Sequence, residues 1–257
     1  MVIAVTTDQS RPRGGFASPG TALLWKAWLE SRSRFVSALG LLASIVIYTV
    51  ITGHERVGPY VHSAYIWGAL FHYALQGLWV LAAFILALGG LRREKATSAV
   101  LFTLGLPVAR LRLFLIRAAL ACAEAIALAL LPALLIPILS SFVGESYPFS
   151  QALAFGALMC TAGLVIVALG LLLSEIFEGE FTAPVVGLCG VTTIFLSYKA
   201  QALSGWNVFD VMSATAYVDP TTKVLKGTAP WPDLAICLLV SFGLLFAVGL
   251  TIRARDL

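Results

Sequence analysis

Two polar side chains lie deep inside apolar stretches of the sequence and are the first candidates for chemistry. Gln76 interrupts the apolar stretch 64–91, and Glu124 interrupts the stretch 113–140. Glu124 follows Leu113 by about 16 Å of helix, which places it near the centre of a lipid bilayer. A charged carboxylate without a partner is costly there, so the side chain must face protein or water. Glu124 could line a substrate pathway, or it could be protonated or hydrogen-bonded as a structural contact between helices.

The other reactive residue types lack the spacing of an active site or a metal site. His54, His62 and His72 are spread around a loop, and interfacial polar contacts explain them better than a metal does. The sequence contains no P-loop, no H-E-x-x-H and no G-x-S-x-G pattern. We therefore expect no catalytic residue, no metal and no cofactor in this chain. The cysteines lie far apart inside apolar stretches and are interpreted as small buried hydrophobic residues: Cys122, Cys160, Cys189 and Cys237.

The composition points to the membrane. Of the 257 residues, 60% are hydrophobic and 12% are charged, against roughly 45–50% and 25% in soluble domains. A soluble fold of this size could not cover so much apolar surface. This excludes a soluble enzyme, a nucleic-acid-binding module and a disordered chain. It predicts an all-α integral membrane protein, with room for about six spanning helices and little room for a soluble domain.

Six apolar stretches are candidates for spans. We expect them at about residues 36–52, 64–91, 113–140, 151–173, 181–204 and 234–252. Residues 1–20 are polar and lack the apolar core of a signal peptide, so we expect a disordered cytoplasmic tail there. Residues 21–257 then form a single transmembrane domain.

Residues 21–35 predict an amphipathic helix that lies along the membrane surface. Leu24, Trp28 and Phe35 share one face at helical spacing, whereas Lys26 and Glu30 lie one turn apart on the opposite face. The segment is too charged to span a bilayer, and its tryptophans suit headgroup depth. The alternative is that this segment simply extends the first span.

The distribution of Lys and Arg predicts the topology. Thirteen of the 17 basic residues lie in the N-terminal segment, the loop between the second and third spans, and the C-terminus. The other side of the membrane would hold only Arg56, Lys199, Lys223 and Lys226. Basic residues concentrate in cytoplasmic loops, so both termini are expected in the cytoplasm. The net charge of +4 is therefore a sign of topology and does not indicate a nucleic-acid partner.

Two segments outside the spans have sequence patterns that predict local structure. The cytoplasmic stretch 92–112 predicts a helix over about residues 94–104, which Gly105 and Pro107 end. The external stretch 205–232 carries Trp206, Phe209 and Trp231, and we expect it to lie on the outer membrane interface.

Four segments occur in an order that resembles a known family. They are LLWKAWLESRSRF, REKATSAVLFTLGLPVARLRLFLIRA, AYVDPTTKVLKG and the terminal RARDL. Together with six spans, they resemble the permease subunit of a bacterial type-2 ABC exporter. The resemblance covers nearly the whole chain after about residue 20.

The resemblance implies a transport complex in a bacterial or archaeal plasma membrane. Two permeases, identical or different, would pair in the lipid bilayer, and two copies of a separate ATP-binding subunit would dock on their cytoplasmic side. ATP and Mg would bind on that subunit and not on this chain. The amphipathic helix and the helix of stretch 92–112, called the coupling helix in this family, would form the contact surface. The matching positions are Leu24, Trp25, Trp28, Glu30, Glu94, Thr97, Phe102, Leu104, Pro107 and Arg110.

Two further points follow from the residues themselves. The apolar spans favour a hydrophobic or amphipathic cargo, such as a lipid, a peptide or a drug. Gln76 and Glu124 leave open an alternative, an ion- or proton-coupled secondary transporter that uses Glu124. An intramembrane enzyme would need a convergent nucleophile and base or a metal set, and the scarcity of histidine inside the spans argues against it.

Overall fold

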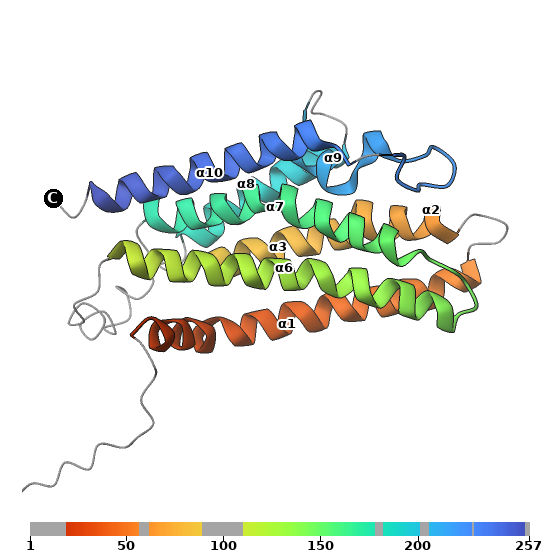
Figure 1. Cartoon of the computed structure of the whole chain (residues 1–257), viewed down its shortest axis with the longest axis horizontal. Coiled ribbons are helices and arrows are strands. Elements are labelled where there is room, and N and C mark those ends of the chain that lie inside the picture. The colour runs from red at the N-terminus through yellow and green to blue at the C-terminus, as the bar shows by residue number, and fades with distance from the viewer. Residues whose placement is uncertain are drawn as a thin grey trace, which may run out of the picture.

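The described residues form a bundle of long helices (Figure 1). The computed structural model describes residues 19–56, 62–88, 110–177, 182–200, 206–227 and 229–254. No strand forms within these ranges, and an isolated β-bridge joins Val218 to Leu225. The predicted tail therefore lies outside the described residues, apart from Pro19 and Gly20, and so does the predicted helix 94–104.

The helices follow one another along the bundle in alternating directions (Figure 1). A first long helix is followed by a composite of an α-helix, a π-helix and a second α-helix, and then by two further long helices. A shorter helix, two small helices and a final long helix complete the order. The elements are α1 (Pro19–Arg56), α2 (His62–Ile66), η1 (Trp67–Ala74), α3 (Leu75–Ala87), α6 (Arg110–Phe142), α7 (Phe149–Ile176), α8 (Thr182–Lys199), α9 (Val208–Ser213), η2 (Thr215–Tyr217) and α10 (Trp231–Arg253).

Five helical segments in the described ranges are long and apolar enough to cross a membrane. They are Gly20–Gly53, His62–Ala87, Leu111–Phe142, Phe149–Ile176 and Trp231–Arg253. These segments confirm an all-helical chain with several helices of spanning length, at the predicted stretches 36–52, 64–91, 113–140, 151–173 and 234–252. The predicted stretch 181–204 contains α8, whose apolar part, Pro184–Lys199, is shorter. The span predicted at residues 181–204 therefore stays a prediction.

Several basic residues lie at one end of the bundle. The starts of α1 and α6 and the end of α10 lie at the same end of the bundle (Figure 1), and Lys26, Arg117 and Arg253 belong to these parts of the helices. We call it the basic end. The opposite end, which we call the outer end, holds α9 and the turn between α6 and α7 (Figure 1).

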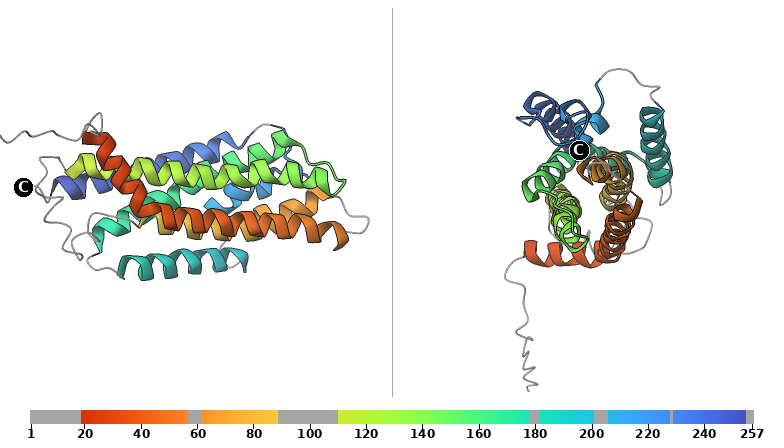
Figure 2. Two further views of the ribbon diagram at one scale, coloured as in Figure 1. Left: turned by 90° about the horizontal axis from the view of Figure 1, so that it is seen from below. Right: turned by 90° about the vertical axis from the view of Figure 1, so that its right-hand side faces the viewer.

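The first part of α1 crosses the bundle axis before the helix turns to run along it (Figure 2). The backbone stays helical from Pro19 to Arg56 without a break. The predicted amphipathic segment 21–35 is thus continuous with the following span, as one alternative held, and yet the helix changes direction. Its placement on the membrane surface stays a prediction.

A row of glycines lets α7 approach its neighbours closely. Gly156, Gly163 and Gly170 are seven residues apart, so they share one face of the helix. A side chain on Gly163 would overlap the ring of Trp79 in α3, and one on Gly170 would lie 2.8 Å from the Cβ of Ala87. A Cβ on Gly156 would lie 3.1 Å from an alanine side chain of α6. Small residues of this kind are typical of tightly packed membrane helices.

Buried aromatic residues of η1 and α3 join these helices to α6 and α7. Trp79 is fully buried, and its Nε1 donates a hydrogen bond of 3.1 Å to the carbonyl oxygen of Ala125. Phe71 stacks on Phe155 with ring centroids 4.8 Å apart. The indole of Trp79 is therefore held by both a hydrogen bond and the glycine row, which leaves it little room to shift.

We expect Gly163→Ala to destabilise the bundle, because the new methyl group must displace a buried, hydrogen-bonded tryptophan ring. Overpacking of this kind costs about 1–3 kcal/mol. The free energy of unfolding, measured by SDS titration of the protein in mixed micelles, reports this cost.

Gly243→Ala in α10 is the matched control, since a Cβ there has no atom within 4 Å. A helical glycine replaced in open space gains about 0.5–1 kcal/mol of backbone stability. Equal effects of the two substitutions would contradict the close approach of α3 and α7.

Candidate functional site

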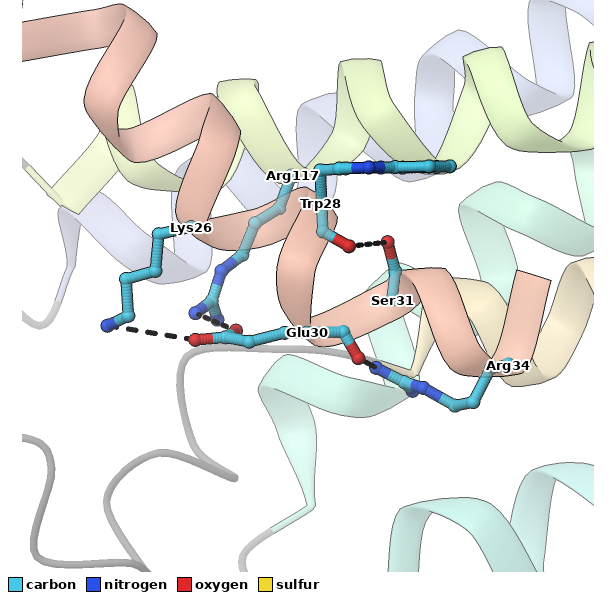
Figure 3. A network of polar contacts seen from close by, with 6 residues as sticks. All are labelled: Lys26, Trp28, Glu30, Ser31, Arg34 and Arg117. Carbon is cyan, nitrogen blue, oxygen red and sulfur yellow. Dashed lines mark hydrogen bonds and ion pairs between the residues drawn. The ribbon is translucent and has the colours of Figure 1, made fainter. Parts of the chain in front are cut away.

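A group of polar side chains occupies the basic end, where the crossing part of α1 meets α6. We call it the Glu30–Glu124 cluster; its members are Lys26, Glu30, Ser31, Arg34, Arg117 and Glu124. Figure 3 shows the residues of α1 in this cluster together with Arg117 of α6. Because α1 and α6 are joined here by polar contacts, the cluster links the predicted amphipathic segment to the interior of the bundle.

Glu30 is the centre of the exposed half of the cluster. Its carboxylate lies 3.8 Å from Lys26 Nζ, one turn away on α1, and 3.7 Å from Arg117 Nη2 on α6 (Figure 3). The guanidinium of Arg34 donates to the backbone carbonyl of Glu30 at 3.4 Å. Partly exposed ion pairs contribute only about 0–1 kcal/mol. These contacts therefore orient the start of α1 against α6 more than they stabilise it.

Glu124 is the centre of the buried half. Its side chain is 3% exposed, and the Ser31 hydroxyl donates a 2.5 Å hydrogen bond to its Oε1. Ser31 also lies 3.3 Å from the carbonyl oxygen of Trp28, a contact drawn in Figure 3. The carboxyl group thus faces protein, as a carboxyl group inside a membrane would have to do. This hydrogen bond connects α1 directly to α6.

A small cavity lies beside Glu124. Glu30, Arg34, Arg117 and Leu120 contribute to its lining, and it offers about 30 Å³ for the centre of a water molecule. A water needs roughly 10–15 Å³ measured in this way, together with polar partners. The cavity is therefore roomy and polar enough to hydrate the carboxyl group. A structural contact and a hydrated pathway residue are both compatible with this geometry.

The predicted contact residues of α1 differ in exposure. Leu24 and Trp25 are 45% and 52% exposed, and the side chain of Glu30 is 42% exposed. Trp28 is half-buried, with its ring centroid 5.6 Å from that of Phe35. Arg110 begins α6. The remaining predicted positions lie outside the described residues: Glu94, Thr97, Phe102, Leu104 and Pro107.

Gln76, the second predicted intramembrane polar residue, belongs to a separate group toward the outer end. Its side chain is fully buried, and its Nε2 donates a 2.5 Å hydrogen bond to the carbonyl oxygen of Phe209. Its Oε1 accepts a 3.0 Å hydrogen bond from Lys199 Nζ at the end of α8. Lys199 also donates to the carbonyl oxygen of His72. The structure therefore places Gln76 and Glu124 in two different clusters.

Sequence reasoning missed the role of Lys199, which was counted only as a charge on the outer side. Its ammonium lies 4.6 Å from the ring centroid of Tyr198 and 4.7 Å from that of Tyr73. Such cation–π contacts add roughly 0.5–2 kcal/mol. Because α8 lies at the edge of the bundle (Figure 2), Lys199 is one of the residues that hold it there.

The π-helix η1 brings a second donor to the same region. Trp67 and His72 are five residues apart, which matches the hydrogen-bond spacing of a π-helix, and their rings stack at 4.8 Å. Trp67 Nε1 donates a 2.9 Å hydrogen bond to the carbonyl oxygen of Ser213. Trp67 and Gln76 thus hold the two ends of the short helix α9.

The stretch 205–232, predicted to be external, is therefore folded into the outer end more deeply than we expected, as far as the structure describes it. Trp206 and Trp231 are 51% and 69% exposed, and their place on the membrane interface stays a prediction. Phe209 is 1% exposed, so the interfacial expectation is wrong for this residue. Farther along, Asp219 accepts hydrogen bonds from the backbone of Thr221 and pairs with Lys226 at 3.0 Å. These contacts lower the pKa of Asp219 to about 2, so the turn keeps an ionised carboxylate at neutral pH.

The predicted absence of a metal site stays a prediction. Within the described ranges, no group of three or more His, Cys, Asp or Glu side chains lies close enough to hold an ion. His62 is instead 3.1 Å from the Ser140 hydroxyl, a polar contact between α2 and α6.

No family model matches the chain, and comparisons with curated proteins and with solved structures found no significant match.

We expect Ser31→Ala to weaken the contact between α1 and α6, because it leaves the buried Glu124 carboxyl without its serine donor. Hydrogen bonds between membrane helices contribute about 1 kcal/mol, and the free energy of unfolding in mixed micelles should fall by that amount. Glu124→Gln keeps an acceptor for Ser31 and should cost less than Ser31→Ala.

Ser33→Ala is the control, since Ser33 lies on the same part of α1 and is exposed. An effect of Ser31→Ala no larger than that of Ser33→Ala would show that the hydrogen bond to Glu124 does not hold α1 in place.

Proposed function

We propose that this chain is the transmembrane permease subunit of an ATP-driven ABC exporter. It would span a bacterial or archaeal plasma membrane six times, with α8 as its fifth span and both termini in the cytoplasm. It would pair with a second permease and dock separate ATP-binding subunits, which bind ATP and Mg. The proposal starts from the order of sequence segments described above.

The exposed start of α1 is the structural observation that carries the proposal. This part of the helix crosses the bundle axis at the basic end (Figure 2) and presents Leu24 and Trp25 there. An apolar residue and a large aromatic residue, rimmed by the charges of Lys26 and Glu30, have the composition of a protein-docking surface. A helix that only crosses the membrane would not need to turn in this way.

The predicted second docking segment is attached to the same end. The segment 89–109 is joined to Leu88, beyond the end of α3, and to Arg110, at the start of α6. Arg34 of α1 donates a 3.4 Å hydrogen bond to the carbonyl oxygen of Ile85, so the end of α3 lies against the first part of α1. A coupling helix in this segment would therefore be attached close to the exposed face of α1.

The Glu30–Glu124 cluster would transmit movement of the exposed face of α1 to the rest of the bundle. When ATP brings the partner subunits together, they would push on the start of α1 and on the coupling helix. Glu30 pairs with Arg117, and Ser31 hydrogen-bonds to Glu124, so α6 would move with α1. This coupling would switch the spans between inward-facing and outward-facing states. A hydrophobic or amphipathic cargo, such as a lipid, a peptide or a drug, fits the apolar helices.

One observation favours a second candidate, an ion- or proton-coupled secondary transporter. Glu124 is buried beside a cavity that has room for water, and intramembrane carboxyl groups of this kind often carry protons or ions. In this case the lone chain, reconstituted in liposomes, should catalyse counterflow that Glu124→Gln abolishes.

The exporter proposal predicts that an ATP-binding chain encoded beside this one co-purifies with it and that the complex hydrolyses ATP. Trp25→Ala should weaken the complex at least about tenfold, because a docked tryptophan commonly contributes 2 kcal/mol or more. Affinity is measured by titrating the purified ATP-binding chain onto the permease in nanodiscs.

Trp206→Ala is the matched control, since Trp206 has nearly the same exposure, 51% against 52%, but follows α8 toward the outer end. Equal weakening by both substitutions, or the absence of any ATP-binding partner together with counterflow by the lone chain, would contradict the exporter proposal.

A further inference from the structure

An apolar groove runs between α1 and α3 on the side of the bundle. It has a volume of about 360 Å³, within the range of small-molecule sites. Leu41, Leu42, Leu78 and Leu81 contribute to its apolar lining. Leu41 and Ile85 are 53% and 38% exposed, so the groove opens away from the bundle and is not a closed cavity.

The groove has a polar end and an apolar end. α1 and α3 run in opposite directions, so Ser33 and Arg34 of α1 lie beside Ile85 of α3, while Leu42 lies toward Leu78. Arg34 lines both the groove and the small cavity beside Glu124. Its guanidinium sits at the basic end, together with the side chains of Lys26 and Arg117. This end therefore suits an anion.

The length of the groove matches one leaflet of a bilayer. From Ser33 to Leu42 the lining covers about 13 Å of helix, and half of the hydrocarbon core is about 15 Å thick. An acyl chain that begins at the Arg34 end would therefore fill the groove as far as the bilayer centre. The orientation rests on the proposed topology, in which the basic end faces the cytoplasm and thus the leaflet rich in anionic lipids.

We infer that the groove between α1 and α3 binds one anionic phospholipid, with an acyl chain along the leucines and the headgroup phosphate on Arg34. A guanidinium binds phosphate oxygens with paired hydrogen bonds, and a zwitterionic headgroup would neutralise part of the attraction. The lipid would cover the side of α1 just beyond its change of direction. It would therefore stabilise the bent form of this helix.

Native mass spectrometry of the full-length chain in detergent tests the site. Titration with phosphatidylglycerol should give one tightly held lipid, and phosphatidylcholine should bind about tenfold more weakly. Arg34→Gln removes the headgroup contact, and Ala38→Phe places a ring inside the groove. Each substitution should weaken phosphatidylglycerol binding about tenfold or more. Arg32→Gln is the control, because it removes the same charge two residues away, where the side chain is exposed and does not line the groove.

The outcomes separate the alternatives. The proposed site would be wrong if phosphatidylglycerol and phosphatidylcholine bound equally well, or if Arg32→Gln weakened phosphatidylglycerol binding as much as Arg34→Gln does. Either result would indicate non-specific attraction of lipids to the basic end. If Ala38→Phe changes the oligomeric state but leaves lipid binding unchanged, the groove binds a second copy of the chain and the lipid site is wrong. Thermal unfolding checks that each variant is folded, and either variant decides the matter if the other fails to fold. The assay contains no ATP-binding chain, so its result does not depend on the exporter proposal.

Discussion

The hydrogen bond between Ser31 and Glu124 is the contact on which the basic end depends. A carboxyl group that is 3% exposed in an apolar bundle needs a partner, and the 2.5 Å contact from α1 supplies it. The bond joins the first part of α1 to α6, and this part of the helix runs in a different direction from the rest of α1 (Figure 2). Because the start of α1 is held there, Leu24 and Trp25 stay exposed on one side, and the groove lined by Arg34 stays open on another.

Buried polar groups elsewhere in the bundle also need hydrogen-bond partners. Three buried donors are satisfied by backbone carbonyls: Gln76 by Phe209, Trp67 by Ser213 and Trp79 by Ala125. These bonds require close contact between helices, which the glycine row of α7 permits. The polar contacts and the glycines therefore cooperate: the glycines bring the helices together, and the indole and amide donors fix how they are placed.

Hydropathy predicted the helices well, because a span must be long and apolar wherever its neighbours lie. The burial of Glu124 followed from the same argument. The hydrogen-bond partner of Glu124 could not be predicted, because Ser31 and Glu124 are 93 residues apart in the sequence and no local pattern pairs them. The π-helix had no recognisable signal. Two features of the fold could have been predicted from the sequence. The seven-residue spacing of Gly156, Gly163 and Gly170 indicates the closely packed face of α7. The short buried helix α9 is indicated by the apolar residues of a segment that was treated as a loop: Val208, Phe209, Val211 and Met212. The predicted helix 94–104 lies outside the described residues.

The orientation of the bundle in the membrane is the claim from which the docking face and the lipid site both follow. Single cysteines at residues 98 and 221, in a chain whose four native cysteines are replaced by alanine, test it directly with a membrane-impermeant maleimide. Thr221→Cys, beyond the outer end, should be labelled in intact cells, whereas Ser98→Cys should be labelled only after the membrane is disrupted. Labelling of Ser98→Cys in intact cells, with Thr221→Cys protected, would contradict the account.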